Sequence, residues 1–202
     1  MNKNIYLSNG NRRMKFPTFS LPARITCPGA TKSCKKFCYA KKAEELWKGP
    51  SQSRNRNLSA TKTSAFIDDM TEIILNRKDK YIRVHESGDF YSQEYLNKWI
   101  QIMKNCPDKS FLIYTQMYDL DYSNLPDNCI LYWTEWYDSK NVPSKGLRAY
   151  VIDDGTCKIK DPVKTTRFNN AHFCTKGKNS KLKCEQCMYC YKGKGDVIFK
   201  LH

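Results

Sequence analysis

Seven of the ten cysteines in this chain fall into two short stretches near its opposite ends. Thiols this close together in sequence are typical of loops that wrap a metal centre, so the fold must hold each stretch in a fixed shape. The first group has three members and the second has four: Cys27, Cys34 and Cys38, then Cys174, Cys184, Cys187 and Cys190.

The length and composition favour one domain in a reducing compartment. The 202 residues are enough for a sizeable core. No stretch reaches the roughly 20 apolar residues of a membrane span, and the opening MNKNIYLSNGNRRMKF lacks the apolar core of a secretory signal. We therefore expect a cytoplasmic protein with no membrane partner, whose cysteines are metal ligands or buried thiols and not disulfides.

The second group has the spacing of an iron–sulfur loop. Cys184, Cys187 and Cys190 form a C-x2-C-x2-C run, which can wrap three corners of a 4Fe-4S cluster, and Cys174 can supply the fourth corner. Zinc sites more often use two separated cysteine pairs. The spacing therefore favours a 4Fe-4S cluster, with zinc as the alternative.

The first group is incomplete as a cage. Cys27, Cys34 and Cys38 have the spacing C-x6-C-x3-C, with no fourth cysteine close by. Three thiolates on a four-iron cluster leave one iron open to a substrate or cofactor. Cys157 could be recruited as a fourth ligand, which would close that position.

The net charge of +15 is concentrated at the two ends of the chain. Residues 1–62 hold 14 Lys and Arg against 2 acids, residues 63–157 hold 10 against 15, and residues 158–202 hold 11 against 3. A basic N-terminal segment favours DNA or RNA as a partner. The alternative is that lysines beside the cysteines offset the negative charge of bound clusters.

The hydrophobic pattern alternates between strands and helices. Such alternation predicts an α/β fold with a parallel sheet or partial barrel. Because the links after two strands are short, we expect an abbreviated parallel β/α partial barrel over 1–156 and a cysteine-rich, metal-binding extension over 157–202. The expected strands are 19–26, 81–89, 110–117, 129–136, 147–153 and 196–201, and the expected helices are 32–47, with Cys34 and Cys38 on one face, 64–77 and one from Ser92.

Several of the expected strands end in polar residues. Ligands of parallel α/β proteins bind at the carboxyl ends of the strands, so these residues predict a polar site. The alternative is that they only satisfy loop backbone. The candidate catalytic residues are His85, Asp89 and Glu135, and the candidate cofactor-binding residues are Ser87, Gly88, Thr115 and Gln116.

Two resemblances add to these expectations. The stretches SLPARITCPGATKSCKKFCYA, RVHESGDFYSQEYLNKWI and FLIYTQ, with the C-terminal C-x9-C-x2-C-x2-C, cover about half of the chain. They resemble the gene-product-eighty-eight-like family of phage-borne proteins. That resemblance implies a phage origin, and hence the host cytoplasm, but no assigned activity.

The second resemblance is to radical S-adenosylmethionine enzymes. A three-cysteine loop after the first strand, Phe37-Cys38-Tyr39 within it, and the segment ESGDF from Glu86 to Phe90 are similar to features of that class. The resemblance implies a partial β/α barrel, S-adenosylmethionine as cofactor and an electron-donor protein as partner. The spacing C-x6-C-x3-C departs from the usual C-x3-C-x2-C of those enzymes.

Overall fold

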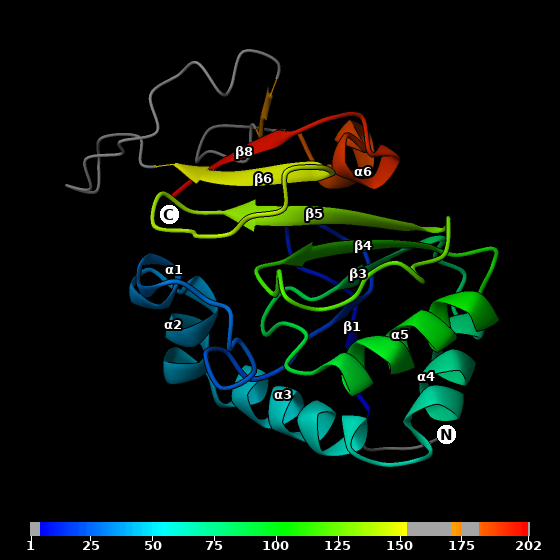
Figure 1. Ribbon diagram of the computed structural model, residues 1–202. Coiled ribbons are helices and arrows are strands. Elements are labelled where there is room, and N and C mark those ends of the chain that lie inside the picture. Colours follow the sequence, from blue (N-terminus) through cyan, green and yellow to red (C-terminus); the bar gives the residue numbers. More distant parts are fainter. Residues whose placement is uncertain (1–4, 153–170, 175–181, 202) are drawn as a thin grey trace.

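The computed structural model describes residues 5–152, 171–174 and 182–201. Its centre is an eight-stranded sheet with the order β1-β2-β3-β4-β5-β6-β8-β7 (Figure 1). β1 is antiparallel to β2, and all other neighbouring strands are parallel. The strands are β1 (Leu7–Ser8), β2 (Thr18–Phe19), β3 (Tyr81–Val84), β4 (Ser110–Thr115), β5 (Cys129–Glu135), β6 (Leu147–Ile152), β7 (His172–Phe173) and β8 (Val197–Lys200).

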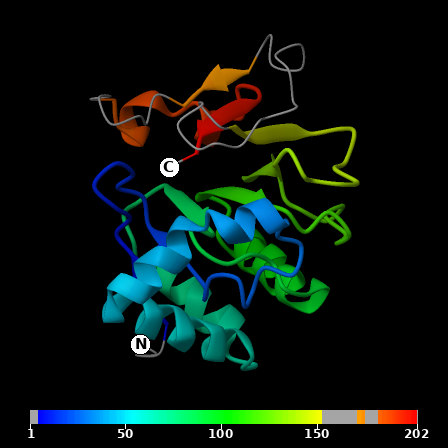
Figure 2. The same cartoon turned by 90° about the vertical axis from the view of Figure 1, so that its left-hand side faces the viewer.

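The helices lie mainly on one side of this sheet. Figure 2, which looks onto the carboxyl ends of the strands, shows the blue to green helices mostly below the sheet, and the orange C-terminal helix with the C-terminal strands at the top. The predicted α/β fold with a mostly parallel sheet is confirmed. The helices are α1 (Lys32–Lys36), α2 (Tyr39–Leu46), α3 (Lys48–Thr61), α4 (Phe66–Leu75), α5 (Gln93–Asn105), α6 (Cys184–Cys187) and the 3₁₀-helix η2 (Cys190–Lys192).

The two faces of the sheet carry different cores, because successive strand residues point to opposite faces. Ile82 and Ile113 lie on the face that packs against α4 and α5. Leu112, Tyr132 and Val197 lie on the other face, where their cluster also includes cysteines of the second group. The sheet therefore separates an apolar helical layer from a face that receives the C-terminal segment.

Most of the predicted elements occur close to their expected positions. The predicted helix 64–77 is α4 (Phe66–Leu75), and Ser92 caps α5 by accepting a hydrogen bond from the Tyr95 N–H. The four strands expected from residue 110 onward are β4, β5, β6 and β8. The predicted strand 19–26 is wrong beyond Phe19, because the chain there turns into the loop that leads to Cys27. The predicted strand 81–89 is wrong beyond Val84, where β3 ends and a loop to α5 begins.

The 14-residue helix α3 was not predicted from the sequence. Its inward side is polar and lacks the apolar period that indicates a helix. Asn57 is 1% exposed, accepts a hydrogen bond from the Tyr6 N–H and donates to the carbonyls of Tyr6 and Ser20. Arg54 forms a buried ion pair with Glu44 at 3.0 Å. Tertiary hydrogen bonds and an ion pair therefore position this helix, a role that an apolar stripe usually has.

The C-terminal segment joins the same sheet, because β8 pairs with β6 and β7 pairs with β8. The expected boundary between residues 156 and 157, and Cys157 itself, lie outside the described residues. None of the described helices is long and apolar enough to cross a membrane.

Candidate functional site

The three N-terminal cysteines lie on a loop and two short helices. Thr31 caps α1 by accepting a hydrogen bond from the Cys34 N–H at 3.1 Å. Cys38 caps α2, and its sulfur accepts from the Lys41 N–H at 3.4 Å. The predicted single helix 32–47 is therefore wrong: Cys38 leaves the helical conformation to cap the next helix, so Cys34 and Cys38 do not share one helix face.

Hydrogen bonds hold this cysteine segment against the carboxyl ends of the strands. The side-chain amide of Gln116, just after β4, donates to the Cys34 sulfur at 3.1 Å. The Ser33 N–H donates to Asp138, which follows β5, at 2.9 Å. Figure 1 shows α1 and α2 at this end of the sheet, on the left, and α6 toward the opposite end. The N-terminal cysteines thus lie at the carboxyl ends of the strands, away from α6.

A large cavity opens beside the N-terminal group. Its volume is about 540 Å³, a size in the range of small-molecule sites. Its walls combine the three cysteines with the predicted strand-end residues and with aromatic side chains. The lining includes Cys27, Cys34, Cys38, His85, Ser87, Gly88, Asp89, Gln116, Thr134 and Trp136.

Asp89 joins the loop after β3 to the end of β4 from inside this wall. Its carboxylate accepts hydrogen bonds from the Thr115 hydroxyl at 2.6 Å, the Gln116 N–H at 2.9 Å and the Phe90 N–H at 2.8 Å. Burial raises the pKa of Asp89 to about 6, although these hydrogen bonds oppose the shift. Its own N–H donates to the Thr26 carbonyl, which fixes the approach to Cys27.

Ser87 and Gly88 line the cavity but also lock two loops together. The Ser87 hydroxyl donates to the Leu21 carbonyl at 2.8 Å. Gly88 has a φ of +83°, and an added Cβ would lie 2.5 Å from the Leu21 Cβ and 2.6 Å from the Thr26 hydroxyl oxygen. Glycine is therefore required here by the close approach of the loop before Cys27.

His85 is buried among aromatic rings. Its Nε2 lies 2.7 Å from the Tyr95 hydroxyl, and its Nδ1 has no hydrogen-bond partner among the residues that the structure describes. Burial lowers the pKa of His85 to about 3, with a further contribution from the charge of Arg83. The ring is therefore neutral near pH 7.

Thr115 and Glu135 lie outside the residues that line the cavity. Thr115 is engaged with Asp89, and the Glu135 carboxylate pairs with Arg148 at 2.5 Å. Thr134, one position earlier on β5, does line the cavity. This difference follows from the two-residue period of a strand, which sends Thr134 and Glu135 to opposite faces.

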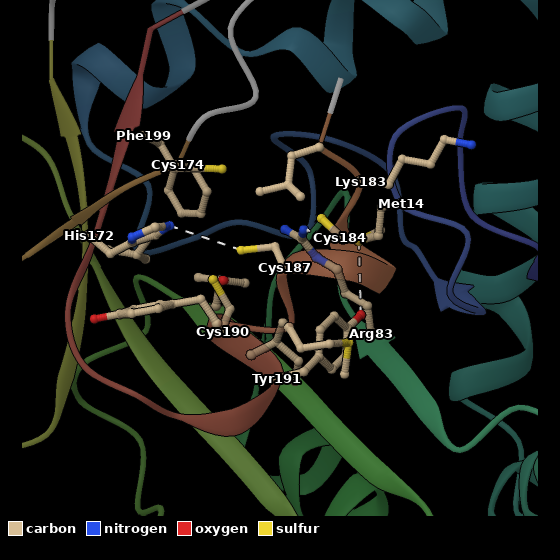
Figure 3. A pocket seen from close by; sticks show the side chains of 16 residues that line it. Met14, Arg83, His172, Cys174, Lys183, Cys184, Cys187, Cys190, Tyr191 and Phe199 are labelled. Carbon is tan, nitrogen blue, oxygen red and sulfur yellow. Dashed lines mark hydrogen bonds between the residues drawn. The ribbon is translucent and has the colours of Figure 1, made fainter. Parts of the chain in front are cut away.

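The C-terminal cysteines surround a smaller pocket on the face of the sheet opposite α4 and α5. Its volume is about 40 Å³, and all four cysteines line it (Figure 3). Cys184 and Cys187 are the ends of α6, and Cys190 begins η2. The Cys174 N–H donates to the Ile198 carbonyl, which ties that residue to β8. The structure therefore brings the four predicted ligands together.

Polar and aromatic groups flank these four thiols. His172 stacks on Tyr189 with ring centroids 4.2 Å apart, and its Nε2 lies 4.0 Å from the Cys187 sulfur. Burial raises the pKa of Cys190 to about 11, and a hydrogen bond from the Tyr114 hydroxyl opposes that shift. In Figure 3 the side chain of Arg83 extends toward the cysteines from β3.

The thiols are not arranged around a point the size of a single ion. Within the described ranges, no three His, Cys, Asp or Glu residues form a group that could hold one metal ion. Burial raises the pKa of Cys27 to about 12 and of Cys34 to about 11, so both are thiols near pH 7. A metal centre bound there would displace the protons of these thiols, and its positive charge would stabilise the resulting thiolates.

Comparison with known proteins identifies the family. A family model described as Gene product 88 matches residues 2–195, a span that contains both cysteine groups. The chain belongs to the Gene product 88 family. The predicted resemblance to a phage-borne family is thereby confirmed.

Two curated relatives are similar to this Gene product 88 protein. The Gene 88 protein of Mycobacterium phage L5 is 28% identical over 197 residues, and that of Mycobacterium phage D29 is 26% identical over 198 residues. Each alignment covers 87% of this chain and 82% of the relative. No solved structure matches.

Several lining residues were missed by the sequence argument, and three of them are polar or aromatic side chains that matter for the chemistry of the sites. Arg83 and Tyr114 line both the cavity and the cysteine pocket, and Trp136 lines the cavity. Arg83 has a sequence signal, since it is a charge inside the otherwise apolar or aromatic strand YIRV. Tyr114 has none, because an aromatic residue in a strand is ordinary core.

The buried neutral imidazole of His85 predicts a pH-dependent stability. Because its folded pKa lies below the ordinary 6.5, the unfolded chain binds a proton between pH 6.5 and 3 that the folded chain does not. Stability from this residue is complete above pH 6.5 and falls on acidification. The loss between pH 7.5 and pH 5 is about 2 kcal/mol.

This pH effect is measured by urea unfolding of the wild type and His85→Gln at both pH values. The difference in unfolding free energy between the two proteins should shift by about 2 kcal/mol in favour of the variant at pH 5. A difference that stays constant with pH would show that His85 titrates normally in the folded protein.

Proposed function

We propose that this Gene product 88 protein is a cytoplasmic iron–sulfur protein that binds a 4Fe-4S cluster at each cysteine group. The observation that carries the proposal is the grouping of Cys27, Cys34 and Cys38 on the wall of one large cavity with His85 to Asp89 and Gln116. When bound, such a cluster supplies one-electron transfer and, where one iron lacks a thiolate, an open coordination position.

The surroundings of the N-terminal sulfurs fit anionic ligands. The Gln116 amide and the Lys41 N–H both donate hydrogen bonds to cysteine sulfur, at Cys34 and Cys38. Such N–H donors stabilise thiolates and are one of the factors that set the potential of a cluster. In our proposal Gln116 also anchors the cysteine segment to β4.

The spacing of the cysteines in the sequence favours a cluster over zinc, because Cys184, Cys187 and Cys190 form one C-x2-C-x2-C run. A tetrahedral zinc site with bonds of about 2.3 Å needs its four sulfurs within about 3.8 Å of one another. No group suited to a single ion occurs in the described part of the chain. A cubane cluster, which has iron and sulfide between its ligands, holds its thiolates farther apart.

The cavity supports the finer proposal of a radical S-adenosylmethionine type of enzyme. The parallel strands follow in chain order from β2 to β6, as in β/α barrels, and the order differs from that of doubly wound folds. The cavity of about 540 Å³ has room for a cofactor beside the open side of a three-thiolate site. Ser87, Gly88 and Gln116 would contact that cofactor, and an electron-donor protein would reduce the site.

Metal analysis of protein purified without oxygen tests the cluster proposal. We expect about eight iron and eight acid-labile sulfide per chain, from two four-iron clusters. Cys34→Ser and Cys187→Ser should each lower both contents by about half, because each removes one ligand of one site.

Cys129→Ala is the matched control, since Cys129 begins β5 and belongs to neither group. It should keep the wild-type iron and sulfide. Stoichiometric zinc without sulfide in the wild type would overturn the cluster proposal.

Product analysis tests the enzymatic form of the proposal. Reduced, iron-loaded protein incubated with S-adenosylmethionine should release 5′-deoxyadenosine, measured by mass spectrometry. Cys34→Ser should release none, whereas Cys187→Ser should keep binding the cofactor. If the wild type formed no 5′-deoxyadenosine and did not bind S-adenosylmethionine, the enzymatic form of the proposal would be rejected. The proposal that the protein binds clusters would not be affected.

A nucleic-acid-binding function is the second candidate. Lys32, Lys35, Lys36 and Lys42 are exposed on α1 and α2, and Trp47 is 65% exposed beside them. Exposed cations and an aromatic ring suit a flexible single strand. Arg54 does not contribute, because it is buried against Glu44.

Salt-dependent binding measures this second function. The affinity for single-stranded DNA or RNA should fall steeply between 50 mM and 200 mM salt, and Lys35→Gln with Lys36→Gln should flatten that dependence. Lys78→Gln with Lys80→Gln, which makes the same charge change elsewhere, is the control. An absence of binding at 50 mM salt would exclude the candidate.

A further inference from the structure

Arg83 lies between the two cysteine groups. It belongs to β3, and its side chain lines both the N-terminal cavity and the C-terminal pocket. The cavity is also lined by Cys34 and Cys38, and the pocket by Cys184 and Cys190. Figure 3 shows this side chain extending toward Cys184 and Cys187.

The direct partners of the Arg83 guanidinium are neutral. Its Nε donates to the His85 carbonyl at 3.0 Å, one terminal nitrogen lies 3.7 Å from the Met14 sulfur, and the group lies 4.8 Å from the centre of the Tyr114 ring. Among the described residues, no ion pair includes Arg83. The charge of Glu86 acts on Arg83 without a direct ion pair, so this partly buried cation has no hydrogen-bonded anionic partner among the described residues.

We propose that Arg83 is the counter-charge shared by the two cluster sites and sets the reduction potential of both. The inference rests on the proposed function, because a cluster held by thiolates on each side would place further negative charge beside the Arg83 guanidinium. Arginine suits this role, since its charge does not titrate and its planar group presents donors in several directions.

Tyr114 acts on the C-terminal site alone. Its ring stacks against the Arg83 guanidinium, whereas its hydroxyl donates a hydrogen bond to the Cys190 sulfur. A nearby positive charge and hydrogen bonds to sulfur both raise the reduction potential of a cluster, because each stabilises the more negative, reduced form. The loss of the Arg83 charge should therefore affect both sites, and the loss of the Tyr114 hydroxyl only one.

Redox titration of anaerobic, cluster-loaded protein, followed by electron paramagnetic resonance, tests this role. Arg83→Gln should lower both midpoint potentials, changing the oxidised-to-reduced ratio at a fixed potential about tenfold, or about 59 mV for one electron. Arg83→Lys keeps the charge and should restore most of the shift. Tyr114→Phe should lower only the C-terminal potential.

Arg56→Gln is the matched control, because it removes the same charge at an exposed position of α3. It should leave both potentials unchanged. A second measurement keeps the wild-type arginine: in Cys34→Ser, which lacks the N-terminal cluster, the C-terminal potential should rise because Arg83 then faces one anionic site.

Unchanged potentials in Arg83→Gln would overturn the inference, as would an unchanged C-terminal potential in Cys34→Ser. A shift of only one site in Arg83→Gln would contradict a shared charge in the same way. These outcomes differ from failure of the proposed function, in which the wild type itself contains neither iron nor sulfide and has no potential to titrate.

Discussion

The carboxylate of Asp89 is the interaction on which the N-terminal site depends. It joins the loop after β3 to Thr115 and Gln116 at the end of β4, while the Asp89 backbone holds the loop that carries Thr26. Gln116 in turn contacts the Cys34 sulfur. One buried acid therefore fixes two strand ends and the start of the cysteine loop, which explains why its desolvation is tolerated.

The two cysteine groups are built in different ways on the same sheet. The first depends on loops that leave the carboxyl ends of β2, β4 and β5 and opens on a cavity of about 540 Å³. The second is carried by α6, η2 and β7 on one face of the sheet, around a pocket of about 40 Å³. This contrast suits a reactive role for the first site and an electron-transfer or structural role for the second. Arg83 is the residue through which we propose that they influence each other.

The sequence predicted this architecture where local pattern and tertiary structure agree. The apolar period of α4 and the alternating strands β4 to β6 were sufficient, because each buries one face against a continuous core. The cavity residues His85, Ser87, Gly88, Asp89 and Gln116 were found because they follow the carboxyl ends of strands in a parallel sheet.

The remaining features depend on contacts that no local pattern contains. Helix α3 is held in place by the hydrogen bond of Asn57 to the Ser20 carbonyl and by the ion pair of Arg54 with Glu44. Because these partners are distant in sequence, the local sequence of α3 resembles that of a polar loop. The cavity is lined by Thr134 and not by the predicted Glu135, because neighbouring residues of a strand point to opposite faces of the sheet. Arg83 could be noticed as a charge within a strand, but its place between two cysteine groups is visible only in three dimensions.

The central claim is that both cysteine groups hold iron. It is tested most directly by anomalous diffraction at the iron edge from crystals of anaerobically prepared protein. The account predicts two separate iron peaks, one beside Cys27, Cys34 and Cys38 and one among Cys174, Cys184, Cys187 and Cys190. A zinc peak at either group, or iron at the second group alone, would contradict it.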